Sequence, residues 1–382
     1  MANSKTAAQL IEIIGAVIKG IKPDISGQDI NWYELYALAM AHSVANILAY
    51  AADETTPDAV CNELAKQSAL AFARCSAYEY ETQRICAEFE KRNIAYMPLK
   101  GYIMREYYPS LEMRTMCDID ILIKGEEIED VHEVMTVLGF ECKERYYERE
   151  DVVTYDKLPL CSYEMHKQLV SSSHTVIDAY YGDGWGFAKR VGESSCHRMS
   201  DEDFFIFQIA HFTKHYQTVG IGIRSVVDIW IYLRKFADKL DWEYIDRELD
   251  KLGMKEFAYN IFKLCDVWFE GVTSEEKIDG MAEYILTSGV YGRTDTSIRI
   301  QKMNNGRSGK TRIEVIFPSY KAMSVLYPSL KKCPYLLPFY WIKRLTVKFA
   351  DGSWKIYLDR QSEYSDEKIS QIEKHFRDIG LK

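Results

Sequence analysis

The sequence predicts a mixed α+β protein in which a small mixed sheet lies between two helical regions. Three observations predict this fold. Residues 1–92 carry apolar side chains at helical spacing, residues 93–185 alternate strand-like and helical stretches before further strand-like ones, and helical spacing returns from about residue 200. Strands and helices in alternation, followed by a run of strands, are typical of an α/β unit with a mixed sheet.

Length and composition indicate a globular protein with a sizeable core. The chain has 382 residues, of which 47% are hydrophobic and 27% charged, enough for two or three domains. The formal net charge of −9 disfavours indiscriminate binding of the whole surface to nucleic acid. Nine cysteines without a CxxC pair predict reduced thiols in the cytoplasm rather than a disulfide framework or a zinc site.

No segment of the sequence predicts contact with a membrane. Glu12 interrupts the apolar N-terminal run and no small-residue cleavage site follows, unlike a secretory signal. The longest apolar stretch, residues 37–52, contains His42, Ser43 and Asn46, so it predicts a buried helix rather than a membrane span. We therefore expect a cytoplasmic protein with no membrane partner.

The N-terminal region, residues 1–92, is predicted to be helical throughout. Apolar residues at helical spacing predict an amphipathic helix over 7–21 and a more buried helix over 32–52. A third helix follows Pro57, which suits a helix start, and we expect it to end at Asn93.

Residues 93–185 are expected to form the sheet. Two short helices are predicted within them, at 101–108 before Pro109 and at 126–138 before Gly139. Strands are predicted at 94–99, 117–123, 140–147, 152–156, 162–169 and 175–181.

Helices are predicted again after residue 200. A helical bundle over 200–290 is expected from four segments separated by short turns, at 201–217, 223–240, 241–253 and 255–271. Residues 291–382 are predicted to be a basic, mostly helical extension. Within that extension, residues 306–360 hold eleven Lys and Arg against three Asp and Glu, a local +8 that leaves about −17 for the rest of the chain. This segment is a candidate partner surface.

Three carboxylates form the candidate chemical site. Asp118 and Asp120 lie two residues apart in the predicted strand CDIDILI, so they point to the same face while the other face is apolar. Carboxylates side by side repel each other unless a cation lies there, and Mg²⁺ is the natural candidate. Glu164 shares a strand face with His166 in SYEMHKQ, and an adjacent strand would bring it to the pair. Three carboxylates can hold two cations, and an exposed strand face is the simpler alternative.

Lys100 and Gly101 stand at a predicted helix start, where free backbone N–H groups can bind phosphate. Lys100 offers a compact positive charge to a triphosphate, although it could equally end a strand in solvent. Arg114 lies in the loop before the CDIDILI strand, where it could pair with a phosphate or neutralise the two aspartates.

His211, Lys214 and His215 share one face of a predicted helix. The two histidines have metal-ligand spacing, but no HExxH glutamate or third ligand accompanies them, so they are expected to support the site or contact the acceptor, as is His166. Arg224 and Asp228, four residues apart, are expected to form an ion pair within one helix. The GxSxG, GxGxxG and complete Walker motifs are absent from the sequence.

These motifs resemble those of a bacterial family of uncharacterised nucleotidyltransferases in the DNA polymerase beta-type superfamily. The resemblance is carried by Leu99-Lys100-Gly101, by Arg114 with Asp118 and Asp120 in R-x3-DIDILI, and by Glu164 with His166. HFTKHY…IRSVVDIWIYL and, near the C-terminus, FPSY, LYP and LLPFYWIKR extend it over most of residues 35–350. The wider superfamily has Gly-Ser where this chain has Lys100-Gly101.

The resemblance implies a nucleotidyltransferase core over residues 93–185. Asp118, Asp120 and Glu164 would be the catalytic ligands of Mg²⁺ or Mn²⁺, and Lys100, Gly101 and Arg114 would bind the nucleotide. The activity implied is transfer of a nucleoside monophosphate from an NTP, with ATP the expected donor, to a hydroxyl of a small molecule, RNA or protein, releasing pyrophosphate. An inactive nucleotide-binding or protein-interaction module on the same fold is the alternative.

Overall fold

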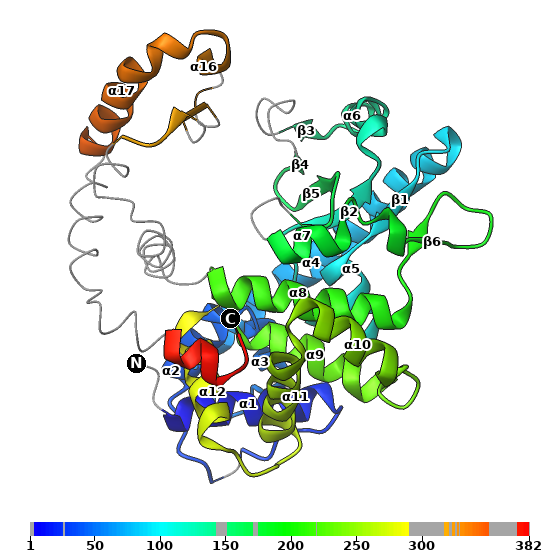
Figure 1. Ribbon diagram of the computed structural model, residues 1–382. Helices are drawn as coiled ribbons and strands as arrows, with labels where there is room; N and C mark the ends of the chain where they lie inside the picture. Colours follow the sequence, from blue (N-terminus) through cyan, green and yellow to red (C-terminus); the bar gives the residue numbers. More distant parts are fainter. Residues whose placement is uncertain are drawn as a thin grey trace. The chain divides into compact units, whose positions relative to one another are not determined.

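The chain forms two compact units (Figure 1), residues 1–291 with 379–382 and residues 292–378. The second unit contains the helices α16 (Ser329–Lys332) and α17 (Leu337–Ala350), joined by the 3-10 turn η7 (Pro334–Leu336). The computed structural model describes residues 4–25, 27–142, 151–170, 175–218, 220–289, 317–320, 323–324, 327, 329–350 and 373–381.

The first unit begins with helices, but the expected single helix over 32–52 is wrong. Ser43 adopts a left-handed conformation with φ +54°, and this breaks the helix after residue 41. The neighbouring His42 is buried, accepts a hydrogen bond from the N–H of Ile223 and contacts the Leu286 carbonyl. These distant bonds outweigh the continuous apolar pattern. The elements are α1 (Ser4–Ile18), α2 (Trp32–Ala41), α3 (Ala45–Leu48), η1 (Ala49–Ala51) and α4 (Asp58–Arg92).

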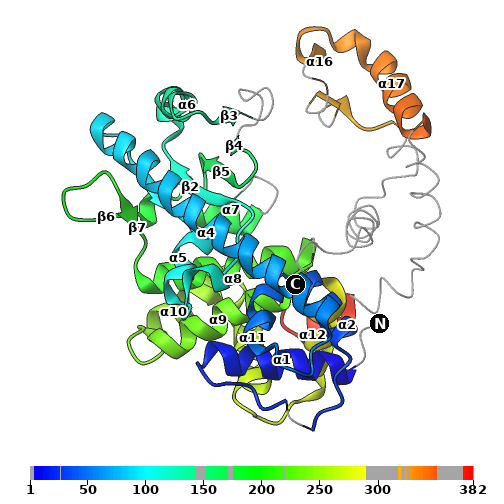
Figure 2. The ribbon, with the colours of Figure 1, turned by 180° about the vertical axis from the view of Figure 1, so that it is seen from behind.

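The long helix α4 connects these N-terminal helices with the sheet, as Figures 1 and 2 show from opposite sides. It has 35 residues and, as expected, stops at Asn93, which caps it in a left-handed conformation. Tyr78, Ile85 and Phe89 of α4 are almost fully buried in the core beneath the sheet. The helix α4 therefore packs against one face of the sheet.

The sheet is mixed, as the sequence predicts, with strand order β1-β2-β5-β4-β3. β2 and β5 pair in parallel, and the other neighbouring pairs are antiparallel. The strands are β1 (Tyr96–Pro98), β2 (Ile119–Ile123), β3 (Glu141–Cys142), β4 (Val152–Lys157) and β5 (Cys161–His166). The segments between β1 and β3 are α5 (Lys100–Met104), η2 (Arg105–Tyr107), η3 (Leu111–Met113), η4 (Gly125–Glu127) and α6 (Ile128–Val137).

The two faces of β2 have opposite chemistry. Ile119, Ile121 and Ile123 belong to the apolar core shared with α4 and α6. Asp120 is also buried but lies on the opposite face, because side chains alternate along a strand. One face of β2 thus packs into the apolar core, and the other face carries Asp120.

The expected strand over 175–181 is wrong, because these residues form the helix α7 (Thr175–Tyr181). Ile177 and Tyr181 are both buried, and their spacing of four residues matches one helix face. The β-branched and aromatic residues of TVIDAYY favoured a strand locally, and tertiary packing overrode that preference. Residues 143–147 of another expected strand lie outside the described residues.

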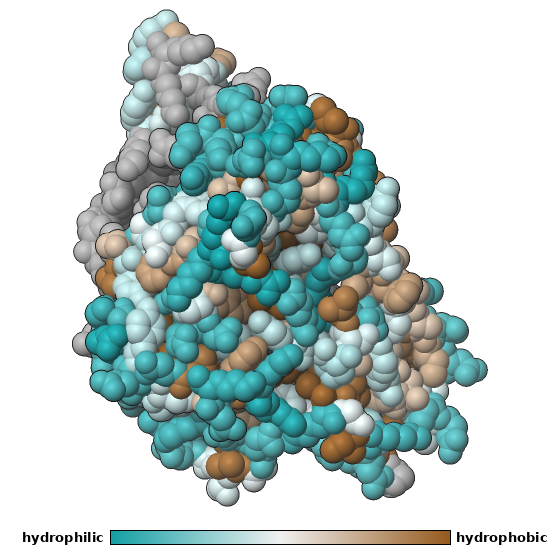
Figure 3. Space-filling view, turned by 90° about the vertical axis from the view of Figure 1, so that its right-hand side faces the viewer, coloured by the Kyte–Doolittle hydropathy of each residue, from teal (hydrophilic) through white to brown (hydrophobic). Residues whose placement is uncertain are grey.

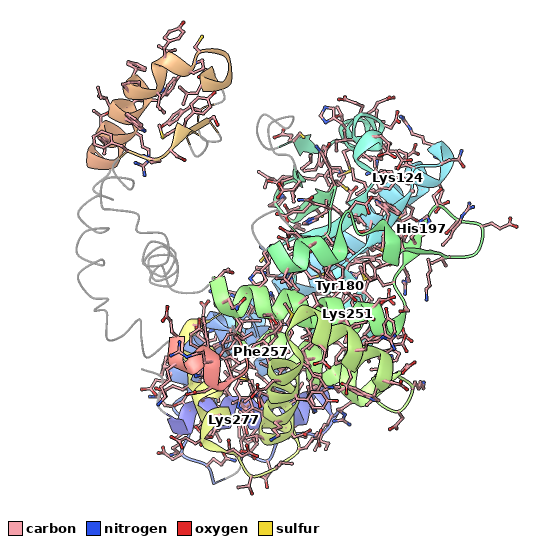
Figure 4. All side chains as sticks on the ribbon, viewed as in Figure 1. Lys124, Tyr180, His197, Lys251, Phe257 and Lys277 are labelled. Carbon is pink, nitrogen blue, oxygen red and sulfur yellow. The ribbon has the colours of Figure 1, made fainter. Side chains whose placement is uncertain are left out.

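Contacts from α7 fix it to the helices that follow. The Tyr180 hydroxyl donates to Glu248 Oε2 at 2.9 Å, and Lys251 lies 2.7 Å from Glu248 Oε1. Glu248 and Lys251 lie on α10 (Trp242–Leu252), and Figure 4 labels Tyr180 on α7 and Lys251 on α10. A short turn and hairpin connect α7 to α8: η6 (Trp185–Phe187), β6 (Lys189–Arg190) and β7 (His197–Arg198).

The helices expected after residue 200 are present. They are α8 (Asp201–Thr218), α9 (Ile223–Phe236), α10 (Trp242–Leu252), α11 (Lys255–Phe269) and α12 (Glu276–Ser288). The mixed α+β class predicted from the sequence is therefore confirmed. Within the described residues, no helix is long and apolar enough to cross a membrane. Hydrophilic side chains dominate the face drawn in Figure 3, with apolar ones scattered among them.

Burial of His42 predicts a loss of stability in mild acid. Burial lowers the pKa of His42 to about 4, whereas the unfolded chain binds the proton near its ordinary value of 6.5. The contribution of His42 is therefore complete above pH 6.5 and falls as the pH drops toward 4. Between pH 7.5 and 5 we expect it to remove roughly 2 kcal/mol from the free energy of unfolding.

Urea unfolding of wild type and His42→Gln at both pH values measures this effect. Glutamine can accept and donate at the same two sites without titrating, so the variant should lose less stability than wild type over the interval. Equal losses in the two proteins would contradict the prediction.

Candidate active site

The parallel pairing of β2 and β5 sets the geometry of the site. Asp120 lies opposite Glu164 in the register, and Leu122 lies opposite His166. The potential ligand atoms of Asp120, Glu164 and His166 all lie within 4.8 Å of one another, and this is the group with metal-binding geometry found among the described residues. Two carboxylates and an imidazole at this separation have the donors needed to hold a divalent cation.

Asp120 is the most heavily contacted member of the cluster. Lys100 Nζ lies 2.6 Å from Asp120 Oδ1, and His166 Nε2 lies 2.7 Å from the same oxygen and 3.4 Å from Glu164 Oε2. Burial opposes ionisation of Asp120, but Lys100 and His166 outweigh it and hold its pKa well below the usual range. Burial and Lys100 also oppose charge on His166, yet its hydrogen bonds to the two carboxylates raise its pKa.

The cluster keeps its two carboxylates charged. The hydrogen bond from His166 lowers the pKa of Glu164. His166 Nε2 hydrogen-bonds to Asp120 and lies 3.4 Å from Glu164, and Lys100 supplies a positive charge beside them. The sequence assigned His166 a supporting role, but the structure places it within the cluster itself.

Asp118 lies beside the cluster, immediately before β2. Burial and repulsion from Asp120 and Glu164 raise the pKa of Asp118 to about 6. Unlike Asp120, its carboxylate makes no ion pair with a described residue, so its surroundings favour the arrival of a cation.

Two cavities meet at this site. The first, of about 380 Å³, is lined by Asp118, Asp120, Gly101 and Arg114 and by residues of α8 and α9. The second, of about 250 Å³, has a largely apolar wall from β4, α7 and α8. Four residues line both cavities, namely Lys100, Glu164, His211 and His215. The carboxylates are thus accessible from a space close in size to small-ligand sites.

Lys100 and Gly101 begin the helix α5, and both line the first cavity. The helix α5 has only five residues, so its dipole is small. A Cβ at Gly101 would lie 2.9 Å from Arg114 Nη1, which shows that the glycine makes room for the guanidinium. Lys100 has a backbone φ of +47°, and only 17% of its side chain is exposed. The alternative that Lys100 ends a strand in solvent is therefore wrong.

Arg114 is engaged by α9 rather than by the aspartates of β2. Its Nε and Nη2 bind the two oxygens of Asp228 at 2.9 and 2.8 Å, and Tyr108 donates to the same carboxylate. The expected ion pair between Arg224 and Asp228 is therefore wrong. Arg224 instead donates from Nη1 to the Thr115 carbonyl at 3.0 Å.

His211 and His215 lie on α8, with ring centroids 4.3 Å apart, on the wall shared by the two cavities. Burial, followed by the nearby His215 and Lys100, lowers the pKa of His211 well below its usual value. Burial and Lys100 lower the pKa of His215 to about 4. Both imidazoles are neutral at pH 7. Lys214 lines the second cavity, where burial and Lys100 lower its pKa.

Sequence reasoning missed the contribution of α9. Arg224, Ser225 and Asp228 all line the first cavity. The available signal was the pair of glycines just before α9, Gly220 and Gly222, of which Gly220 lines the cavity and Gly222 is the N-cap of the helix. The roles of the ten residues singled out from the sequence stay predictions, although all of them line one or both cavities.

More than half of the chain matches a known protein family. A family model described as "Uncharacterised nucleotidyltransferase" matches residues 28–270. The chain belongs to this family. No curated protein and no solved structure gives a match.

The region matched by the nucleotidyltransferase family runs from just before α2 to the end of α11. It therefore includes the acidic cluster, both cavities and the α9 residues opposite the cluster. The family membership expected from the LKG, DIDILI and ExH motifs is confirmed.

The close approach of Gly101 to Arg114 yields a test of the site's architecture. We expect Gly101→Ala to displace the guanidinium and to cost about 1–3 kcal/mol in the free energy of unfolding, because overpacking shifts a buried ion pair. Gly125→Ala is the matched control, since nothing lies within 4 Å of a Cβ placed there.

Thermal or urea unfolding of both variants measures the difference. If Gly101→Ala is as stable as Gly125→Ala, the contact does not explain the glycine.

Proposed function

We propose that the protein is a metal-dependent nucleotidyltransferase. It would transfer a nucleoside monophosphate from an NTP, with ATP the expected donor, to a hydroxyl group of an acceptor and release pyrophosphate. The observation that carries the proposal is the convergence of Asp120, Glu164 and His166, with Asp118 beside them, on a cavity in a chain of this family.

The donor atoms suit a divalent cation. Asp118, Asp120 and Glu164 would hold Mg²⁺ or Mn²⁺, since both ions prefer carboxylate oxygens. When bound, the cation would lower the pKa of the attacking hydroxyl and offset charge on the triphosphate.

The chain's own residues would position the reactants. Lys100 and His166 keep Asp120 and Glu164 ionised, so the carboxylates are ready for a cation without a prior change of protonation. Neutral His211 and His215 form the boundary between the two cavities and can donate or accept hydrogen bonds there. Most of the rate gain would come from positioning and electrostatic stabilisation.

The acceptor remains a hydroxyl compound of one of three classes: a small molecule, an RNA or a protein. The second cavity favours an acceptor with an apolar portion, because Val152, Leu169, Ile177 and Phe207 contribute to its wall. Residues 306–316 and 351–360 of the basic segment lie outside the described residues, and its role as a surface for an acidic acceptor stays a prediction.

A second function is favoured by the contact between Lys100 and Asp120. The lysine amine occupies an oxygen on which a cation would bind, which fits a nucleotide-binding module without catalytic activity. Calorimetry separates the two functions, because metal-dependent NTP binding with no pyrophosphate release over many acceptors would favour the module.

Loss of the acidic cluster should abolish transfer. We expect Asp120→Asn and Glu164→Gln to lower pyrophosphate release at least about 100-fold, because each removes charge that a catalytic cation needs. The assay incubates the protein with labelled NTPs, Mg²⁺ or Mn²⁺ and cell extract, and follows both pyrophosphate and labelled acceptors. Removal of divalent ions with EDTA should have the same effect.

Glu141→Gln is the matched control, since Glu141 is an exposed carboxylate on β3 of the same sheet. It should keep wild-type activity. Equal labelling by wild type and Asp120→Asn would rule out the enzymatic proposal.

A further inference from the structure

Arg224 is a cationic group of the first cavity, and within the described part of the chain it has no carboxylate partner in an ion pair. Lys100 is paired with Asp120, and Arg114 is paired with Asp228. Arg224 makes no ion pair with a described residue. Its Nη1 donates to the Thr115 carbonyl, and its buried Nε has no hydrogen-bond partner.

The surroundings of Arg224 disfavour its charge. Burial and the neighbouring Arg114 lower the pKa of Arg224, although Asp228 partly compensates. A guanidinium in such a place destabilises the protein unless an anion offsets its charge. Because the side chain lines the cavity, that anion can come from a ligand.

Asp118 has the opposite requirement in the same cavity. Its carboxylate lines the cavity and makes no ion pair with any described residue. Among the described residues, Asp118 therefore has no cation in ion-pair contact and Arg224 has no anion in ion-pair contact, although both side chains line one cavity. A metal-bound polyphosphate satisfies both, with its cation near Asp118 and its phosphates near Arg224.

The start of α9 adds a second feature that favours an anion. α9 has 14 residues, begins at Ile223 after Gly222 and has no side-chain cap. Gly220 and Ser225, on either side of this start, line the cavity together with Arg224. The N-terminal turn of a helix of this length carries partial positive charge, which the five-residue α5 lacks.

We propose that Arg224 and the first turn of α9 bind the β- and γ-phosphates of a metal-bound nucleoside triphosphate. This inference rests on the proposed function and deepens it, because it places the leaving pyrophosphate on the helical side of the cavity, across from the β2 carboxylates. Arg224 would then offset the negative charge that grows on the leaving group as the bond from the α-phosphorus to its bridging oxygen breaks.

The test is binding of inorganic tripolyphosphate in the presence of Mg²⁺, measured by calorimetry without any transfer reaction. Wild type should bind this probe. Arg224→Met should weaken binding about 10- to 100-fold, because it removes charge-assisted hydrogen bonds while keeping a side chain of similar length. Arg224→Lys, which keeps the charge but not the planar fork, should lie between the two.

Arg234→Met is the matched control, because Arg234 lies in the last turn of the same helix and is paired with Glu270 at the surface. It should bind tripolyphosphate as wild type does. A second measurement uses the wild-type protein alone, so it does not depend on the folding of a variant. Cys117 is an exposed thiol on the cavity wall, and Mg²⁺-tripolyphosphate should slow its alkylation but not that of Cys61 on α4.

The outcomes separate this proposal from the proposed function. If tripolyphosphate binds equally to wild type and Arg224→Met, or leaves Cys117 alkylation unchanged, the phosphate site is overturned while transfer activity is untouched. If binding depends on Arg224 but no nucleotide is transferred, the phosphate site stands and the enzymatic proposal fails.

Discussion

The site depends on the register between β2 and β5. Parallel pairing places Asp120 directly opposite Glu164, and the alternation of side chains sends both to the face that α4 and α6 do not cover. A shift of β2 by one residue would turn Asp120 into the apolar core and bring isoleucines to the cavity. The isoleucines of β2 are almost fully buried, so the packing that stabilises the fold also fixes where the charges lie.

Features that depend on neighbouring residues could be predicted from the sequence. The two-residue spacing of Asp118 and Asp120 predicted that both would point to one side, and they line one cavity. Asn93 predicted the end of α4, because asparagine tolerates the left-handed conformation of a helix cap. The mixed sheet followed from the alternation of strand and helix patterns.

Features that depend on distant contacts could not be predicted in this way. The break at Ser43 arises because His42 binds groups far along the chain, near Ile223 and Leu286. Arg224 and Asp228 have the spacing of a helical ion pair, yet Arg114 approaches from the loop before β2 and takes the aspartate. Local spacing shows which groups can meet, but it does not show which competing partner wins.

The ion pairs of the site differ in how many hydrogen bonds each carboxylate accepts and from which groups. Arg114 with Asp228 is a bidentate pair in the lining of the first cavity, and it holds the loop before β2 against α9. Lys100 with Asp120 is a pair at the cluster, where the amine and His166 share one carboxylate oxygen. The left-handed backbone of Lys100 costs roughly 1 kcal/mol and allows its short reach to that oxygen.

The bonds around Thr115 have a mechanical consequence. Its carbonyl accepts from both Arg114 and Arg224, so the loop that leads into the sheet and the helix that faces it are fastened at the same point. The loop and α9 are therefore linked through this carbonyl as well as through the Arg114–Asp228 pair, and the arginines of both links line the first cavity.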